Sequence, residues 1–135
     1  MIIGGGLTGC EMAYEVAQSG RKPVIVELQD DILIAPGSSM ANTSFLRDAF
    51  EDYKVPIYTS AKTVSADESS LTIIDEAGNE IRIPADVIVQ SIGFKRGLPF
   101  EVPEGADHVH VIGDAKKISN LLNAVHSAYK LAMMI

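Results

Sequence analysis

Residues 1–10 read MIIGGGLTGC, and the expected fold follows from this segment. The apolar pair at 2–3 reads as the end of a strand, and the glycines behind it have the spacing G-x-G-x-x-G, at Gly4, Gly6 and Gly9. In such a turn the first glycine permits a tight bend, the second lets a pyrophosphate approach the backbone, and the third lets a helix pack closely on the sheet. The segment therefore predicts a strand, a phosphate-binding turn and a helix that points its free N–H groups at the phosphates, with Leu7 and Thr8 completing the turn.

The residues after the turn complete a strand–helix–strand unit. Residues 8–19 have apolar side chains at helical spacing, and Gly20 stands where a helix C-terminus favours a left-handed residue. The nearly unbroken apolar run at 23–27 is typical of a parallel strand covered on both faces. Residues 1–27 thus predict a βαβ unit, which is the context in which the glycine spacing indicates dinucleotide binding. A glycine turn without a ligand, or one that serves a methyl donor, are the alternatives.

Further along, the pattern predicts a loop, two helices, several parallel strands and a small meander. The expected elements are a loop at 32–39, a helix capped by Asn42, strands at 55–58, 86–91 and 108–112, short meander strands at 63–66, 71–75 and 80–83 with a hairpin at Gly78-Asn79, and a helix from Asn120. The fold class is therefore α/β, a Rossmann-like doubly wound parallel sheet with an antiparallel β-meander around 61–84.

Glu27 ends the second predicted strand, where the carboxylate that reads the ribose of a dinucleotide belongs. Such a carboxylate accepts hydrogen bonds from the ribose hydroxyls and repels a 2′-phosphate, and no arginine follows within residues 28–31. This arrangement predicts NAD(H) rather than NADP(H). The alternative is a surface glutamate at a strand end.

Two residues beside the turn have a structural explanation as well as a functional one. Glu11 is expected in the first helical turn, where the helix dipole alone favours an acid. The thiol of Cys10 stands near a helix N-terminus, which can activate it, but its place on the predicted core face favours a small buried apolar residue. We assign no chemistry to the three histidines, and the pattern predicts no metal site.

The composition excludes several classes of protein. The chain has 135 residues, enough for one ordinary domain, and a formal net charge of −7, which disfavours binding to a nucleic-acid backbone. No apolar run is long enough to span a membrane, so no membrane partner is expected. The single cysteine cannot form an internal disulfide, and no secretion signal is evident at the N-terminus, so a cytoplasmic location is expected.

Several segments together resemble the NAD(H)-binding domain of FAD-dependent pyridine-nucleotide oxidoreductases. The resemblance is strongest to the C-terminal part of flavoproteins similar to old yellow enzyme, such as enoate and dienoyl-CoA reductases and NADH:flavin oxidoreductases. The matching segments are the glycine turn and helix at 2–13, the strand with its ribose acid at 24–27, the strand and glycine at 83–93, and the Gly-Asp motif with its helix at 111–114 and 123–125.

This resemblance implies roles for four further residues. Glu11 would lie near the nicotinamide ribose. Gly93 would lie near the nicotinamide, and Gly113 and Asp114 would belong to a second FAD motif, with Asp114 contacting the flavin nucleotide. Residues 1–107 would then be the NAD(H)-binding domain, and residues 108–135 the returning part of an FAD domain.

The resemblance also implies a larger parent enzyme. Its FAD and FMN would be held by an FAD-binding portion and an FMN barrel that this sequence lacks, and the short first strand leads us to expect an excised fragment. The chain would then bind a small-molecule dinucleotide and pass hydride toward a flavin, with no acid, base or nucleophile of its own. The alternatives are a non-catalytic adenine-nucleotide-binding or structural domain, and a standalone sensor of a dinucleotide or methyl donor.

Overall fold

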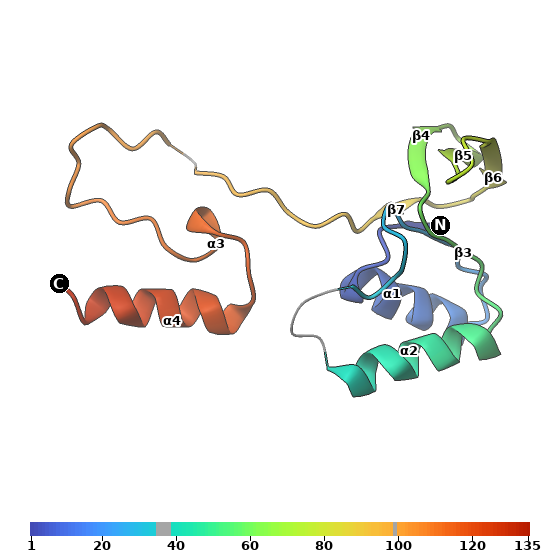
Figure 1. The fold of residues 1–135 in the computed structure, drawn as a ribbon, viewed down its shortest axis with the longest axis horizontal. Helices are drawn as coiled ribbons and strands as arrows, with labels where there is room; N and C mark the ends of the chain where they lie inside the picture. The colour runs from blue at the N-terminus through green and yellow to red at the C-terminus, as the bar shows by residue number, and fades with distance from the viewer. Residues whose placement is uncertain (35–38, 99) are drawn as a thin grey trace. The chain divides into compact units, whose positions relative to one another are not determined.

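The computed structural model describes residues 1–34, 39–98 and 100–135 (Figure 1). Its chain folds as two units, Met1–Ile92 and Gly93–Ile135. The loop predicted at 32–39 begins with residues 32–34, whereas its centre at 35–38 lies outside the described residues.

A four-stranded parallel sheet forms the centre of the first unit. Its strands are β1 (Ile2–Ile3), β2 (Ile25–Val26), β3 (Ile57–Tyr58) and β7 (Val89–Gln90), in the spatial order β3-β2-β1-β7. β1 pairs with β2 on one side and with β7 on the other, so that Ile2 lies opposite both Ile25 and Val89. The short first strand is therefore central in the sheet, and the predicted α/β, Rossmann-like fold is confirmed.

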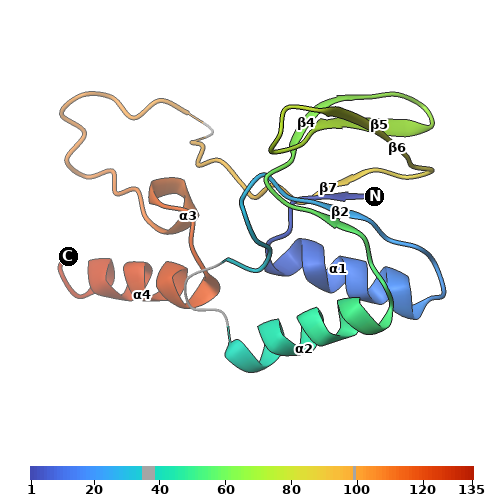
Figure 2. The ribbon, with the colours of Figure 1, turned by 45° about the vertical axis from the view of Figure 1, so that its right-hand side comes forward.

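Two helices cover one face of this sheet, α1 (Leu7–Gln18) and α2 (Met40–Asp52) (Figure 2). Between helices and sheet lies a buried cluster of ten residues: Ile2, Cys10, Ala13, Ala17, Ile25, Ile32, Leu33, Leu46, Phe50 and Val55. Because side chains alternate along a strand, Ile2 and Ile25 face the helices while their neighbours Ile3 and Val26 face the other way. The apolar stripes of the two predicted helices therefore form this core.

The helix α1 ends as its sequence predicts. Gly20 has a positive φ of 77° and follows the C-cap Ser19, so a left-handed residue terminates the helix. The Gly20 N–H donates to the carbonyl of Ala17 and the Arg21 N–H donates to that of Val16. This pair of bonds is a Schellman motif, which satisfies carbonyls that the helix end would otherwise leave unpaired.

The opposite face of the parallel sheet carries the antiparallel meander (Figure 2). Its strands β4 (Lys62–Ala66), β5 (Ser70–Ile74) and β6 (Glu80–Pro84) pair in chain order. Its core consists of Val26, Ala61, Leu71, Ile73 and Ile83. At the β5–β6 turn the Asp75 carboxylate accepts a hydrogen bond from the Asn79 N–H at 2.7 Å, which confirms the predicted hairpin.

The start of α2 differs from the prediction. The helix begins at Met40, and Ser39, not Asn42, occupies the N-cap position with extended backbone angles. The carbonyl of Ser39 already accepts a bond from the Thr43 N–H, so Asn42 lies inside the first helical turn. The prediction of Asn42 as the cap is wrong. Serine and asparagine are both favoured at N-caps, so residue type alone does not distinguish Ser39 from Asn42.

The second unit contains α3 (Gly113–Lys116) and α4 (Leu121–Ala132). The helix predicted from Asn120 is confirmed as α4, and the Asn120 side chain caps it by accepting a hydrogen bond from the Asn123 N–H at 2.9 Å. The strand predicted at 108–112 is wrong, because these residues form no strand in the structure. A strand needs a neighbouring strand to satisfy its backbone groups, and none lies beside these residues in the described part of the unit. Among the helices that the structure describes, none is both long and apolar enough to cross a bilayer.

Candidate functional site

The glycine turn lies at the point where the order of the parallel strands reverses. From β1 the chain proceeds to β2 and β3 on one side, whereas β7 lies on the other side of β1. In open α/β sheets, ligands bind outside the carboxyl ends of the strands at such a switch point. Gly4 follows β1 and Ser91 follows β7, and the Ser91 N–H donates to the carbonyl of Ile3 at 2.7 Å. The candidate site is therefore the crevice edge formed by these two strand ends.

Two glycines of the turn are required by close backbone contacts. Gly4 has a φ of +107°, and a Cβ there would overlap the carbonyl oxygen of Ser91. Gly9 lies buried in the first turn of α1, where a Cβ would overlap the carbonyl oxygen of Gly4. Gly9 thus lets the helix approach the strand end, and Gly4 lets the two strand ends approach each other. The close approach at Gly9 corresponds to the helix packing that the spacing predicts, whereas the approach of Ser91 to Gly4 is an additional constraint.

Gly6 differs, because a Cβ built there would meet no described atom within 4 Å. Gly6 is the N-cap of α1, and the first bond inside the helix runs from the Cys10 N–H to the Gly6 carbonyl at 3.0 Å. The N–H groups of Leu7, Thr8 and Gly9 therefore have no acceptor within the helix. Open space above Gly6 and free donors at the helix N-terminus fit a phosphate group.

The Glu27 carboxylate is fixed against this turn from the end of β2. Its Oε2 accepts a hydrogen bond from the Gly5 N–H at 2.5 Å, and its Oε1 accepts one from the Gln29 N–H at 2.8 Å. A carboxylate offers about four acceptor positions, so half of them remain for hydroxyl groups of a ligand. The residue predicted to read the ribose is thus oriented by the residue between the first two glycines of the turn.

The remaining predicted residues of the first unit lie along α1. Leu7 is half-buried and packs against the core under the helices, whereas Thr8 is exposed at the helix start. Glu11 is exposed and opens the second turn, because the helix begins at Leu7, one residue earlier than predicted. Its predicted place in the first turn is therefore wrong, and the dipole explanation for an acid there is weaker.

Cys10 is a core residue in this structure. Its side chain is fully buried, and Sγ donates to the Gly5 carbonyl at 3.3 Å. Burial raises the pKa of the thiol to about 12, an effect larger than the opposing charge of Arg47. The structure thus supports the packing role that the sequence favours over a reactive thiol.

The Cys10 thiol is expected to resist alkylation in the folded protein. A pKa raised from 9.0 to about 12 lowers the thiolate fraction at pH 8 by roughly a hundredfold to a thousandfold, and the thiolate is the reactive species. Labelling with a maleimide, followed by mass spectrometry, should be slow in native buffer and fast in 6 M urea. Equal rates in the two conditions would contradict the buried assignment.

The other predicted residues belong to the second unit. Gly93 is exposed and begins this unit. The Gly113 N–H donates to Ser127 Oγ at 3.0 Å, and a Cβ on Gly113 would lie 3.7 Å from that of Ala124, so the Gly-Asp motif packs on α4. Asp114 is exposed and accepts a bond from the Ser119 N–H at 3.2 Å. The predicted residues thus form two groups, one in each unit.

The sequence did not predict the residues of the 31–33 segment and of α2 that support the glycine turn. The Leu33 N–H donates to the Gly5 carbonyl at 2.7 Å, and Arg47 on α2 binds both Asp31 and the carbonyl of Ile32. A contact between Arg47 and residues 31–32 was not predictable, because no local pattern indicates a contact between residues that are distant in sequence. The only sequence feature that indicates a partner for an arginine here is the acidic pair Asp30-Asp31, which precedes the apolar residues Ile32 and Leu33.

A parallel sheet with a glycine turn at its switch point is the architecture of dinucleotide-binding proteins. Residues 1–128 match the family model described as pyridine nucleotide-disulphide oxidoreductase. The chain therefore belongs to this family, and its fold is that of a domain of flavin-dependent oxidoreductases.

Two curated relatives and one solved structure are similar to nearly the whole of this chain. Cinnamate reductase of Clostridium sporogenes is 39% identical over 142 residues, which cover 100% of this chain and 21% of that protein. NADH oxidase of Thermoanaerobacter brockii is 28% identical over 138 residues, again covering 100% of this chain and 21% of the relative. A solved 2-naphthoyl-CoA reductase complex superposes with a TM-score of 0.75 at 21% identity, covering 99% of this chain and 20% of that one. The chain thus spans about a fifth of the length of these relatives.

Proposed function

We propose that this chain is the NADH-binding module of a flavin-dependent oxidoreductase and positions the nicotinamide to pass hydride to a flavin held by another part of a larger enzyme. The observation that carries the proposal is the Glu27 carboxylate, which is fixed by the Gly5 N–H beside the open N-terminus of α1. Family membership supports the redox chemistry, because the nicotinamide supplies the hydride when it is bound.

In this proposal the backbone of the turn binds the pyrophosphate. The N–H groups at Gly6, Leu7, Thr8 and Gly9 donate to phosphate oxygens, and the positive end of the α1 dipole adds favourable electrostatic energy. Gly6 leaves the space that the phosphates need, since any side chain there would point into it. No residue of this chain acts as acid, base or nucleophile.

The Glu27 carboxylate after β2 selects NADH over NADPH. Glu27 accepts hydrogen bonds from the hydroxyl groups of the adenosine ribose. It uses the carboxylate lone pairs that the N–H groups of Gly5 and Gln29 do not occupy. A 2′-phosphate would bring further negative charge beside the Glu27 carboxylate, so its binding costs electrostatic energy.

We further propose that the larger enzyme is of the kind related to old yellow enzyme that the sequence resembles, located in the cytoplasm. The relatives named cinnamate reductase and NADH oxidase support this, because each matches over the whole of this chain. Gly93 would then approach the nicotinamide, and Gly113 and Asp114 would face the FAD. The domain boundary near residue 107 and the roles of these residues are part of the proposal.

Isothermal titration calorimetry of the purified chain with NADH, NADPH and ADP tests the function. We expect NADH to bind at least about tenfold more tightly than NADPH, since one charge-assisted hydrogen bond is worth this factor. NADH should also bind more tightly than ADP. Equal affinity for ADP and NADH would favour a domain that only holds an adenine nucleotide, and a lack of binding by all three ligands would overturn the proposal.

A further inference from the structure

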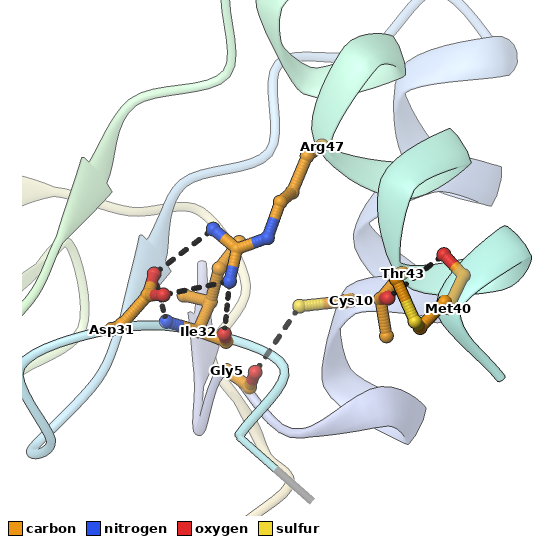
Figure 3. Close-up of polar contacts among 7 residues, drawn as sticks. All are labelled: Gly5, Cys10, Asp31, Ile32, Met40, Thr43 and Arg47. Atoms are coloured by element: carbon orange, nitrogen blue, oxygen red, sulfur yellow. Dashed lines mark hydrogen bonds and ion pairs between the residues drawn. The ribbon is translucent and has the colours of Figure 1, made fainter. Parts of the chain in front are cut away.

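A clamp from the second helix holds the segment that lies behind the glycine turn. The Arg47 guanidinium binds the Asp31 carboxylate through two hydrogen bonds, of 3.0 and 2.7 Å, in a bidentate ion pair (Figure 3). Its Nη2 also donates to the carbonyl of Ile32 at 2.7 Å. One side chain of α2 therefore fixes both a side chain and a backbone group in residues 31–32.

The residues that Arg47 binds, Asp31 and Ile32, immediately precede a residue with a strained backbone conformation. Leu33 has a φ of +60°, which is unfavourable for a leucine, and its side chain is buried under the helices. Such a conformation persists only where the surrounding contacts impose it. The contacts around it are the burial of Ile32 and Leu33 and the three hydrogen bonds that Arg47 makes to Asp31 and Ile32.

Leu33 connects the segment held by Arg47 to the glycine turn through a backbone hydrogen bond. Its N–H donates to the Gly5 carbonyl at 2.7 Å. The same carbonyl accepts a hydrogen bond from the Cys10 thiol at 3.3 Å (Figure 3). A Cβ on Gly5 would lie only 2.6 Å from Cγ2 of Ile32, so the segment is packed against the turn. The Gly5 N–H in turn orients Glu27. The peptide groups of Gly5 thus connect the clamp to the carboxylate.

We propose that Arg47 is a positioning residue of the dinucleotide site, which acts through residues 31–33 to fix the Gly5 peptide groups and, through them, the Glu27 carboxylate. This inference rests on the proposed function for its ligand, whereas the contacts themselves lie within one unit of the chain.

The charge of Arg47 supports the same role. The hydrogen bond from Arg47 holds the pKa of Asp31 below its ordinary value. Because this shift is downward, the ion pair is intact at neutral pH and is lost only as the pH falls through the lowered pKa. Without Arg47, the Asp31 carboxylate would lose its ion-pair partner.

Amide hydrogen exchange of the full chain, measured by NMR, tests the clamp without any ligand. In Arg47→Met we expect the Leu33 and Gly5 amides to exchange about tenfold faster, because a lost hydrogen bond to a charged group has an effect of this size. The Ile25 amide, which donates to the carbonyl of Pro56 inside the sheet, should be unchanged. A loss of global stability would instead accelerate all three amides alike.

The matched control is Arg82→Met. Arg82 forms an ion pair with Asp67 at 2.6 Å on the meander, with an equally exposed aspartate but a more exposed arginine side chain, 65% against 43% for Arg47. This variant should leave the Leu33 and Gly5 amides unchanged. Arg47→Lys should lie between wild type and Arg47→Met, because a lysine can pair with Asp31 but lacks the fork that reaches both partners.

NADH titration then connects the clamp to binding. We expect about fivefold weaker NADH binding in Arg47→Met and a change of less than twofold in Arg82→Met. Unchanged exchange at Leu33 and Gly5 would overturn the clamp, and altered exchange with unchanged NADH affinity would overturn its role in binding. If the wild-type chain binds no dinucleotide, the proposed function fails, and the positioning role fails with it even where the exchange data show the clamp.

Discussion

Replacing Gly9 with alanine is expected to lower the free energy of unfolding by about 3 kcal/mol or more. Alanine normally stabilises a helix by about 1 kcal/mol relative to glycine, so the sign of the effect is informative. At this position the added Cβ would overlap the Gly4 carbonyl, which is backbone and cannot rotate away. Either α1 moves off the sheet or the turn distorts. Urea denaturation followed by far-UV circular dichroism measures the loss.

Gly6→Ala is the matched control for this prediction. It adds the same methyl group three residues earlier, where no described atom lies within 4 Å of the new Cβ. Its φ of −68° suits any residue, so the unfolding free energy should fall by less than about 1 kcal/mol. If Gly9→Ala unfolds at the same urea concentration as Gly6→Ala, the close contact between the helix and the strand end is not real.

Replacing Glu27 with arginine should shift the preference between the two dinucleotides by roughly 100-fold toward NADPH. The change removes the acceptor for the ribose hydroxyls and supplies a cation for the 2′-phosphate. NADH should bind more weakly than to the wild type and NADPH more tightly. Calorimetric titration with both dinucleotides measures the ratio of the two dissociation constants. A ratio that stays at the wild-type value would show that Glu27 does not read the ribose.

Glu27→Gln separates the charge from the hydrogen bond. The amide oxygen can still accept from the Gly5 N–H, but the negative charge that opposes a 2′-phosphate is gone. We expect a ratio between those of the wild type and Glu27→Arg, with a smaller loss of stability than in the arginine variant. Glu27→Arg leaves the N–H groups of Gly5 and Gln29 without their acceptor.

The parts of the fold that local chemistry determines were predictable from the sequence. The glycine spacing after an apolar strand predicted the turn at the centre of the sheet, and Gly20 predicted the end of α1. The meander followed from short alternating segments and from the Gly78-Asn79 turn. The position of Glu27 at the end of β2 was also predictable, because in this fold the end of the second strand lies next to the glycine turn.

Features that depend on distant neighbours could not be predicted. Residues 108–112 have the composition of a strand, but their conformation depends on a partner strand that the described part of the second unit does not supply. The Arg47 clamp joins two segments that share no pattern, and the left-handed Leu33 is buried directly after the residues that Arg47 binds. Leucine at such an angle contradicts its own preference, so no propensity argument could have placed it there.

The position of β1 between β2 and β7 has a consequence for how the protein folds. Ile2 pairs with Ile25, which is close in sequence, and also with Val89, which is synthesised much later. Contacts between such distant residues form slowly, because the intervening chain must first be brought into order. On the ribosome, β1, α1 and β2 can assemble while the far side of β1 still exposes unpaired backbone groups. The unpaired edge of β1 is then a transient aggregation surface until β7 pairs with it.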